Sequence, residues 1–398
     1  MLIAACTAAF LVAWRRRWAV PVWAAVLIAL GLRLAMAVLA RGYTPEDVAV
    51  CFQDAGRLVL AGRDPLTQLP RYQWNFLPLM PYAFAAEIRT GVPWSLAAKL
   101  APIAGDLAVT ALLGRLVPGR GSGTAPLLYA LCPVAVLVSA VHGQVEPVAL
   151  ALAIGALRCA QRGATVRCGL LAGLAVATKT WPVLLVFGML RETPVRLWWR
   201  LLLPLGAVPL GLLLSVRLFL HDSVWAAVER LVSYRSLVGV WGWTGILNFF
   251  GIAGSGFAGP DVDRFQRIGA ALLVVAMACV VLLRAPGAIA LTAAILLTFL
   301  VVTAGFGVQY LLWPMPYVIA LRRPSGLVFA VVASCYTTFV YLIVIPHPQA
   351  HWLTAIEQWA CVPVILSALL ALPSGPRRTG AHARGPGGSH RVLESARA

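Results

Sequence analysis

The chain has 398 residues, of which 61% are hydrophobic and only 12% are charged, whereas a soluble domain carries about 25% charged residues. Its mean hydropathy is +0.85, and most of the net charge of +18 lies in short arginine clusters between apolar runs, as expected for loops on the cytoplasmic side of a membrane. This composition excludes an ordinary soluble domain and argues against nucleic acid as a partner.

Apolar runs long enough to cross a bilayer, which takes roughly 20 helical residues, recur along the chain. Backbone groups in hydrocarbon must pair within their own segment, and the alternating pattern of barrel strands is absent. We therefore expect an all-α, polytopic transmembrane helical bundle of about ten spans (8–12), formed by residues 1–372. Residues 373–398, rich in Gly, Arg and Ser, are predicted to be a basic, disordered cytoplasmic tail. The clearest apolar runs are 19–40, 201–220, 270–283, 289–302, 327–345 and 352–372.

The arginine clusters predict an orientation in the cell membrane. Cytoplasmic positions are expected for 15–17, 158–167, 191–200, 322–323 and the tail. The outer segments would then be 41–75, 142–146, 179–182, 221–266, 304–309 and 346–351. If the Pro-containing segment 77–86 also crossed the membrane, residues 142–146 would fall on the cytoplasmic side. We therefore expect 77–86 to be an interfacial or re-entrant helix and not a span. The eight cysteines are scattered without metal-ligand spacing, so we expect neither a metal nor another cofactor.

The first predicted outer loop contains an amphipathic helix, from about residue 45 to 61, that lies at the membrane surface. Val48, Phe52 and Ala55 recur there at helical spacing, and Asp47 stands at the start. An acid at this position either complements the helix dipole or acts as a general base. Dipole complementation is the simpler interpretation on physical grounds alone.

A short polar run, which contains His142, Gln144 and Glu146, separates two apolar helices further along. It is either a hydrogen-bonded buried turn or a functional site, since an ionisable group in hydrocarbon is costly. Asp106 allows the same two interpretations, and a structural ion pair with Arg33 or Arg115 is one of them.

The segment 168–190 is predicted to form two half-depth helices that meet around Lys179 and Trp181. Each half is too short to span, and both flanks are basic, so the tip lies part-way through the membrane, as at intramembrane cavities. Lys179 is one of only two lysines in the chain. A compact cation at such a tip suits a lipid phosphate, and the alternative is a lysine that snorkels to the interface.

Two later outer segments could complete the same site. The loop 221–266 carries Arg235 as a candidate phosphate ligand, together with aromatic residues such as Trp241 that suit sugar or prenyl stacking. An aromatic belt at the membrane surface is the alternative. Gln309 and Tyr310 end the turn at 305–310 and could close the site.

Taken in order, these motifs resemble the bacterial branch of the glycosyltransferase C superfamily, most of all the polyprenol-phosphate-mannose-dependent mannosyltransferases of family 87. The resemblance covers roughly residues 33–317. Its motifs are Asp47 with the Gly-Arg-Asp-Pro at 62–65, Gly143-Gln144, Gly169, Gly173, Lys179, Pro182 and Gln309-Tyr310.

The resemblance implies an integral membrane glycosyltransferase that moves a sugar, most often mannose, from polyprenyl phosphate to an extracytoplasmic hydroxyl of a glycolipid or glycan, with inversion. Asp47 would be the general base, with Asp54 as the second choice, since it lies seven residues further along a regular helix. Lys179 and Arg235 would bind the donor phosphate. The expected substrate-binding residues are His142, Gln144, Glu146, Trp181, Gln309 and Tyr310.

Two other classes of protein fit parts of the pattern. A secondary transporter or lipid flippase would place Asp106, Glu146 and Lys179 along its path, but it should also show internal repeats, and the sequence has none that is apparent. A scaffold subunit of an envelope complex would need no carboxylate at all.

Overall fold

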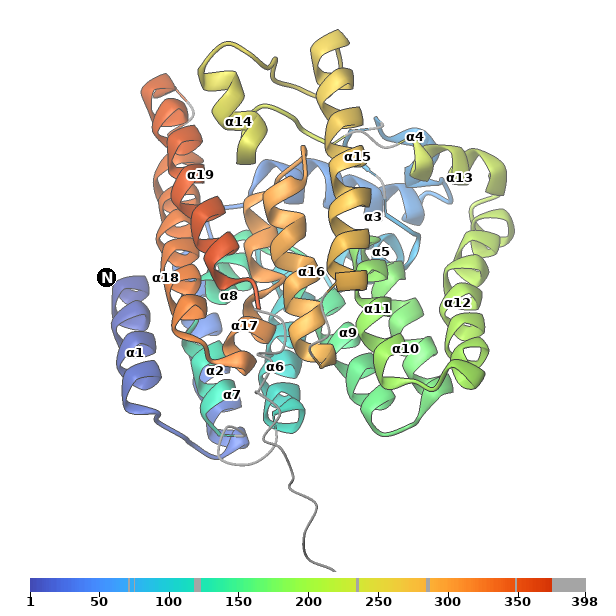
Figure 1. The fold of residues 1–398 in the computed structure, drawn as a ribbon. Coiled ribbons are helices and arrows are strands. Elements are labelled where there is room, and N and C mark those ends of the chain that lie inside the picture. The colour runs from blue at the N-terminus through green and yellow to red at the C-terminus, as the bar shows by residue number, and fades with distance from the viewer. Residues whose placement is uncertain are drawn as a thin grey trace, which may run out of the picture.

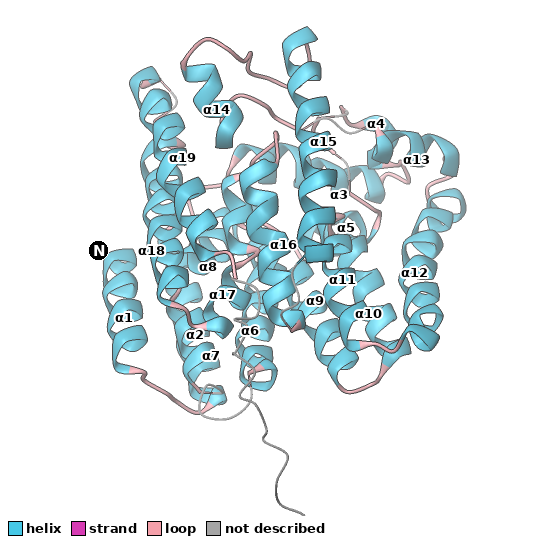
Figure 2. Cartoon of the chain, viewed as in Figure 1, coloured by secondary structure: helices cyan, strands magenta, loops and turns pink. Residues whose placement is uncertain are grey.

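The computed structural model describes residues 1–70, 72–74, 76–117, 123–233, 236–283, 287–347 and 349–373. Within these ranges the chain is built from helices and has no β-strand, apart from one antiparallel bridge between Val238 and Gly256. Figures 1 and 2 show the resulting bundle. The all-α prediction is confirmed. Nearly all of the predicted tail, residues 374–398, lies outside the described residues.

Nineteen α-helices are interrupted by short π- and 3₁₀-helical segments, denoted η, within the described part of the chain. In order they are α1 (Leu2–Arg16), α2 (Val22–Leu39), η1 (Asp47–Phe52), α3 (Gln53–Leu60), α4 (Pro65–Gln68), α5 (Leu79–Arg89), α6 (Trp94–Leu116), α7 (Thr124–Leu131), α8 (Pro133–Val136), η3 (Leu137–His142), α9 (Glu146–Gln161), α10 (Thr165–Thr178), η4 (Trp181–Leu185), α11 (Val186–Glu192), η5 (Val195–Leu197), α12 (Trp198–Phe219), α13 (Val224–Val232), α14 (Gly242–Phe249), α15 (Pro260–Leu283), α16 (Ala288–Val302), η6 (Val308–Leu312), α17 (Met315–Leu321), α18 (Pro324–Phe339), η7 (Val340–Val344) and α19 (His351–Ala371).

Six of the described helices are long and apolar enough to cross a membrane, or seven if the bent pair Thr124–Leu131 and Pro133–His142 forms one span. The chain is therefore a multi-pass membrane protein. The six are Val22–Leu39, Trp94–Leu116, Val195–Phe219, Pro260–Leu282, Pro324–Val344 and His351–Ala371.

The predicted count of about ten spans is not confirmed, because several apolar runs form helices shorter than a span. Thr165–Thr178, Ala288–Val302 and Val308–Leu321 are of this kind. Most residues of α16 are buried against other helices. A helix enclosed by protein does not have to match the thickness of the bilayer by itself.

The predicted break between two half-length helices is confirmed. Helix α10 ends at Thr178, and Lys179 has an extended backbone (φ −157°, ψ 145°). Pro182 then stands in the first turn of η4, where a residue without an N–H is tolerated. A second break follows η3, where Gly143 adopts a left-handed conformation (φ 87°).

Helix α10 packs closely against α12 at its glycines. A Cβ atom on Gly169 would overlap the carbonyl oxygen of Leu201, and one on Gly173 would lie 2.9 Å from Val208 Cβ. The two glycines, four residues apart, thus allow α12 to approach α10 closely. Helix α12 itself lies at the edge of the bundle (Figure 1), with little of its surface covered by protein.

The amphipathic helix predicted near residues 45–61 is present as η1 followed by α3. Val48, Phe52 and Ala55 are buried as expected, and Phe52 stacks on Phe84 of α5 with ring centroids 4.9 Å apart. Helix α5 has 11 residues, too few to span a bilayer, which agrees with the expectation that this segment does not cross.

The connections of the bundle are divided between its two ends (Figure 1). Those between α1 and α2, α9 and α10, and α11 and α12 lie at one end, whereas α3, α13 and α14 lie at the other. Arginines 15–17, 158–167 and 191–200 belong to the first group of connections or to the adjoining helix ends. These three clusters thus lie at the same end of the bundle, as predicted.

Candidate functional site

A cavity of about 1320 Å³ lies between the first loop, the two helix breaks and α15. Such a volume exceeds the upper end of typical small-molecule sites, and it suits a large substrate or two substrates together. Seven of the ten predicted site residues line it: Asp47, His142, Gln144, Lys179, Trp181, Gln309 and Tyr310.

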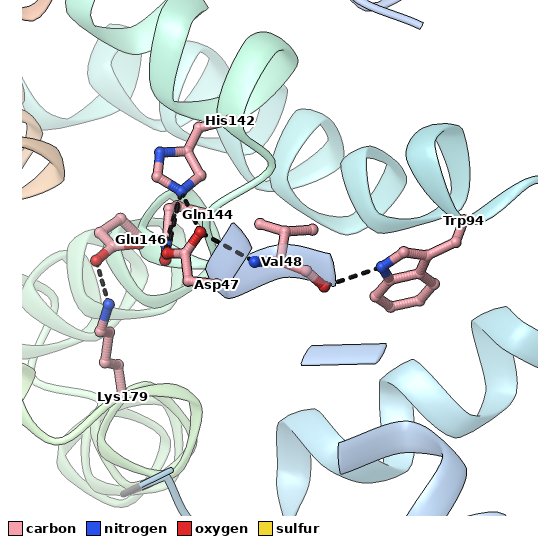
Figure 3. Close-up of polar contacts among 7 residues, drawn as sticks. All are labelled: Asp47, Val48, Trp94, His142, Gln144, Glu146 and Lys179. Atoms are coloured by element: carbon pink, nitrogen blue, oxygen red, sulfur yellow. Dashed lines mark hydrogen bonds and ion pairs between the residues drawn. The ribbon is translucent and has the colours of Figure 1, made fainter. Parts of the chain in front are cut away.

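Asp47 is held by donors from three places in the chain (Figure 3). His142 Nε2 lies 2.9 and 3.1 Å from its two carboxylate oxygens, the amide nitrogen of Gln144 donates to one of them, and the Val48 N–H donates at 2.9 Å. An ionised carboxylate only accepts hydrogen bonds, so the His142 nitrogen that faces it carries a proton. The Asp47 side chain is still 40% exposed and faces the cavity.

Opposing effects act on the pKa of Asp47. Burial raises the pKa. The charge and hydrogen bond of His142, the charge of Lys179 and the hydrogen bond from the Val48 N–H lower it, and together they outweigh the effect of burial. The pKa therefore lies below the ordinary value of 3.8, and the group is ionised at neutral pH. A fixed carboxylate in this state can accept a proton from a hydroxyl in the cavity.

Local structure fixes the position of Asp47. The buried Val48 side chain anchors the first turn of η1, and the Val48 carbonyl accepts a hydrogen bond from the Trp94 indole at 2.9 Å (Figure 3). On the other side, His142 packs edge-on against the Tyr341 ring at 4.9 Å. The carboxylate and its main donor are thus each held by a second contact.

Lys179 forms a buried ion pair, which the sequence analysis did not foresee. Its Nζ donates to Glu146 Oε1, and both side chains are almost completely buried. The ammonium also lies 5.1 Å from the centre of the Phe76 ring and 5.8 Å from that of Tyr310. Glu146 itself does not line the cavity; it lies behind Lys179 and compensates its charge.

Asp54 does not reach the cavity. It forms an exposed ion pair with Arg57 at 3.4 Å. The expectation that it shares a face with Asp47 assumed a regular α-helix, but residues 47–52 are π-helical, and a π-turn takes more residues than an α-turn. Arg235 lies outside the described residues.

Asp106 is part of a separate buried network. Arg33 Nε donates to its carboxylate at 3.0 Å, and neither side chain is exposed. Hydroxyls of Tyr129 and Ser139 donate to it as well, at 2.6 and 2.7 Å. This is the structural ion pair with Arg33 that was one of the predicted alternatives, and it does not line the cavity.

An aromatic stack forms one wall of the cavity. The Trp181 and Trp313 rings are stacked at 4.2 Å with an angle of 11° between their planes, and Tyr310 lies 4.2 Å from Trp313. Sequence reasoning missed Trp313. Trp313 lies three residues after Tyr310, at the end of η6 (Val308–Leu312). Side chains three residues apart eclipse each other in a 3₁₀-helix, so this spacing was the signal in the sequence.

Arg267 is a second residue that the sequence analysis missed. It lines the cavity from α15, is exposed, and has no ion-pair partner among the described residues. Its signal was a basic side chain at the start of a long apolar run, just after the predicted outer loop. Its charge thus faces the cavity, which the carboxylates of Asp47 and Asp263 line as well.

No protein-family model matches the chain. Among the described residues, no group of three or more His, Cys, Asp and Glu side chains is placed to hold a metal ion.

Proposed function

We propose that the chain is a glycosyltransferase of the cell membrane that moves a sugar, mannose in the first instance, from a polyprenyl-phosphate donor to a glycolipid or glycan hydroxyl. The observation that carries this proposal is the Asp47 carboxylate, which is ionised, held by three donors and exposed to a large cavity within a membrane protein. The resemblance of the ordered sequence motifs supports the same function.

In this mechanism the acceptor oxygen attacks the anomeric carbon of the donor from the side opposite the phosphate, and Asp47 takes the hydroxyl proton. The bond between the anomeric carbon and the phosphate oxygen breaks, and its electron pair leaves with polyprenyl phosphate. The configuration at the anomeric carbon is inverted. A positioned base contributes about 100- to 10,000-fold to such a step.

The remaining walls of the cavity suit the donor. Arg267 provides a cation for the phosphate, where charge develops as the sugar leaves. The stacked rings of Trp181 and Trp313 offer apolar faces to a sugar. Val183 on η4 and Leu273 on α15 line another part of the cavity, and such apolar side chains suit the first units of a prenyl chain.

The alternative of a secondary transporter or lipid flippase has less support. It would need Asp106 on the transport path, but this carboxylate is fully buried against Arg33, away from the cavity. Glu146 and Lys179 neutralise each other.

Reconstitution in liposomes with radiolabelled polyprenyl-phosphate mannose and a glycolipid acceptor tests the proposal. We expect Asp47→Asn to lower turnover by at least ~100-fold, because the base is lost while the size of the side chain is kept. Asp54→Asn is the matched control, and turnover should be unchanged. Full activity in Asp47→Asn would show that the base is elsewhere, and no transfer from any polyprenyl-phosphate sugar would exclude the function.

A further inference from the structure

A further buried acid, Glu357, lies in the bundle outside the contacts of Asp47. Glu357 is 4% exposed and belongs to α19, one of the membrane-spanning helices. An ionisable side chain within a span is costly unless it is paired. Its partner is the indole of Trp241, whose N–H donates to Glu357 Oε1. An indole can only donate, so the direction of this hydrogen bond is fixed.

The neighbouring side chains of α19 hold the same stretch of chain. Gln358 Nε2 donates to the Gly239 carbonyl at 3.2 Å, and the Gly242 N–H donates to Cys361 Sγ at 3.2 Å. Polar groups at 357, 358 and 361 lie within about one helical turn. One turn of α19 therefore binds residues 239–242, which lead into the first residue of α14. Helix α14 packs along α19 in Figure 1.

The stretch that α19 holds is part of the cavity wall. Trp241 lines the cavity, as do Leu237 and Phe257 from the same connection between α12 and α15. Glu357 does not line it. Any effect of Glu357 on a substrate must therefore pass through the indole that it fixes.

We infer that Glu357 is a positioning residue, which fixes the Trp241 ring in the wall that a substrate sugar contacts. The part of this inference that concerns substrate rests on the proposed function. The contact between α19 and the wall does not.

Trp243 offers a matched control two residues away. Its indole N–H also makes a hydrogen bond, to the Val302 carbonyl at 3.1 Å, but Trp243 does not line the cavity. A general loosening of the connection would affect both tryptophans, whereas a positioning role of Glu357 concerns only Trp241.

The test measures KM for donor and acceptor in proteoliposomes. We expect Glu357→Ala to raise at least one KM by up to about tenfold, from the loss of the hydrogen bond that holds the Trp241 indole, with kcat within about twofold of wild type because Asp47 is untouched. Glu357→Gln keeps an acceptor oxygen and should restore most of the loss. In a Trp241→Phe background, Glu357→Ala should add nothing further, and Trp243→Phe alone should leave both KM values unchanged.

Hydrogen exchange of residues 237–249, measured by mass spectrometry, separates this inference from the proposed function. Faster exchange in Glu357→Ala than in Glu357→Gln is expected even if no sugar is transferred. Equal exchange in wild type and Glu357→Ala would overturn the inference, as would additive effects of Glu357→Ala and Trp241→Phe or an equal KM effect of Trp243→Phe. Altered exchange in a protein that transfers no sugar would count against the function alone.

Discussion

Lys179 and Glu146 form a buried ion pair. Replacing only one of the two residues leaves the other charge unpaired and should destabilise the protein. Lys179→Met leaves the carboxylate of Glu146 buried and unpaired, which typically costs about 3–5 kcal/mol. We therefore expect this variant to unfold at a clearly lower temperature in detergent, and Lys179→Met/Glu146→Gln to regain most of the loss. A Lys179→Met variant as stable as wild type would show that Glu146 does not depend on the ammonium.

The double variant also separates the contribution of Lys179 from that of Arg267. With the neutral pair in place, we expect donor KM to change by less than tenfold, whereas Arg267→Gln should raise it about tenfold or more, since hydrogen bonds to charged groups are worth about 1.5–3 kcal/mol. Arg267→Lys should recover part of the loss because the charge returns in a different shape. Donor titrations of the three variants measure this, and the reverse order would assign the phosphate to Lys179.

Asp64 provides a test of pH dependence. Burial raises its pKa to about 6 from 3.8, with the nearby charge of Asp222 acting in the same direction and the Leu66 N–H opposing it. The native state then binds this proton more tightly than the unfolded chain does, so unfolding free energy falls as pH rises from about 4 to about 6 and stays lower above.

We expect Asp64→Asn to remove that pH dependence and to be the more stable protein at pH 7, by about 3 kcal/mol at most. Asn still caps a helix N-terminus, so the hydrogen bond to Leu66 is kept. Thermal unfolding at pH 5 and pH 7.5, with the exposed Asp54→Asn as control, measures the difference. A wild-type protein that gains stability relative to Asp64→Asn as pH rises would contradict the assignment.

At the residue scale, the sequence predicted which side chains are functional candidates better than it predicted their partners. His142 and Gln144 were candidates because they lie in a polar run between two apolar helices, and Asp47 was one because of the family resemblance. The three side chains meet in one site. The pairing of Lys179 with Glu146 joins positions 33 residues apart, which no local pattern encodes. The prediction that Asp54 shares a face with Asp47 was wrong, because the sequence does not show that η1 is π-helical.

At the scale of elements, long apolar helices and the break at Lys179 were predictable, since length, charge and proline determine them locally. The number of spans was not. Apolar composition does not distinguish a helix that faces lipid, such as α12, from one enclosed by protein, such as α16, and only the former has to match the bilayer.

The contact between α10 and α12 gives a prediction at this scale. Gly169→Ala should push α12 away, because its Cβ would overlap the Leu201 carbonyl, and overpacking of this kind costs about 1–3 kcal/mol. Gly211→Ala on α12 is the control, since no atom lies within 4 Å of the added Cβ and alanine favours a helix. Thermal unfolding should separate the two variants, and equal stability would contradict the close packing.

For the whole molecule, the arrangement of helix breaks explains how a polar site exists within an apolar bundle. Backbone without helical pairing is tolerated at membrane depth only where protein or a cavity surrounds it. The breaks after His142 and Thr178 both open onto the cavity, and each contributes side chains to it. The long helices α12 and α19 lie on opposite sides of the bundle (Figure 1).

The orientation of the bundle decides on which side of the membrane the cavity opens. The arginine clusters predict that the connection between α11 and α12 is cytoplasmic and the first loop extracytoplasmic, and the two lie at opposite ends of the bundle (Figure 1). Ala61 and Arg196 are exposed positions in these two segments. In a background without the eight native cysteines, we expect a membrane-impermeant maleimide to label Ala61→Cys on intact cells.

Arg196→Cys should react only after the membrane is permeabilised. An outer cavity is what the proposed reaction needs if its acceptor is an extracytoplasmic glycan, because the sugar then reaches that face on its lipid carrier and requires no nucleotide there. Labelling of Arg196→Cys but not Ala61→Cys on intact cells would place Asp47 on the cytoplasmic side. The acceptor would then have to be a hydroxyl on the cytoplasmic side. The labelling result would not test the role of Asp47 as the base, which the activity of the Asp47→Asn variant tests.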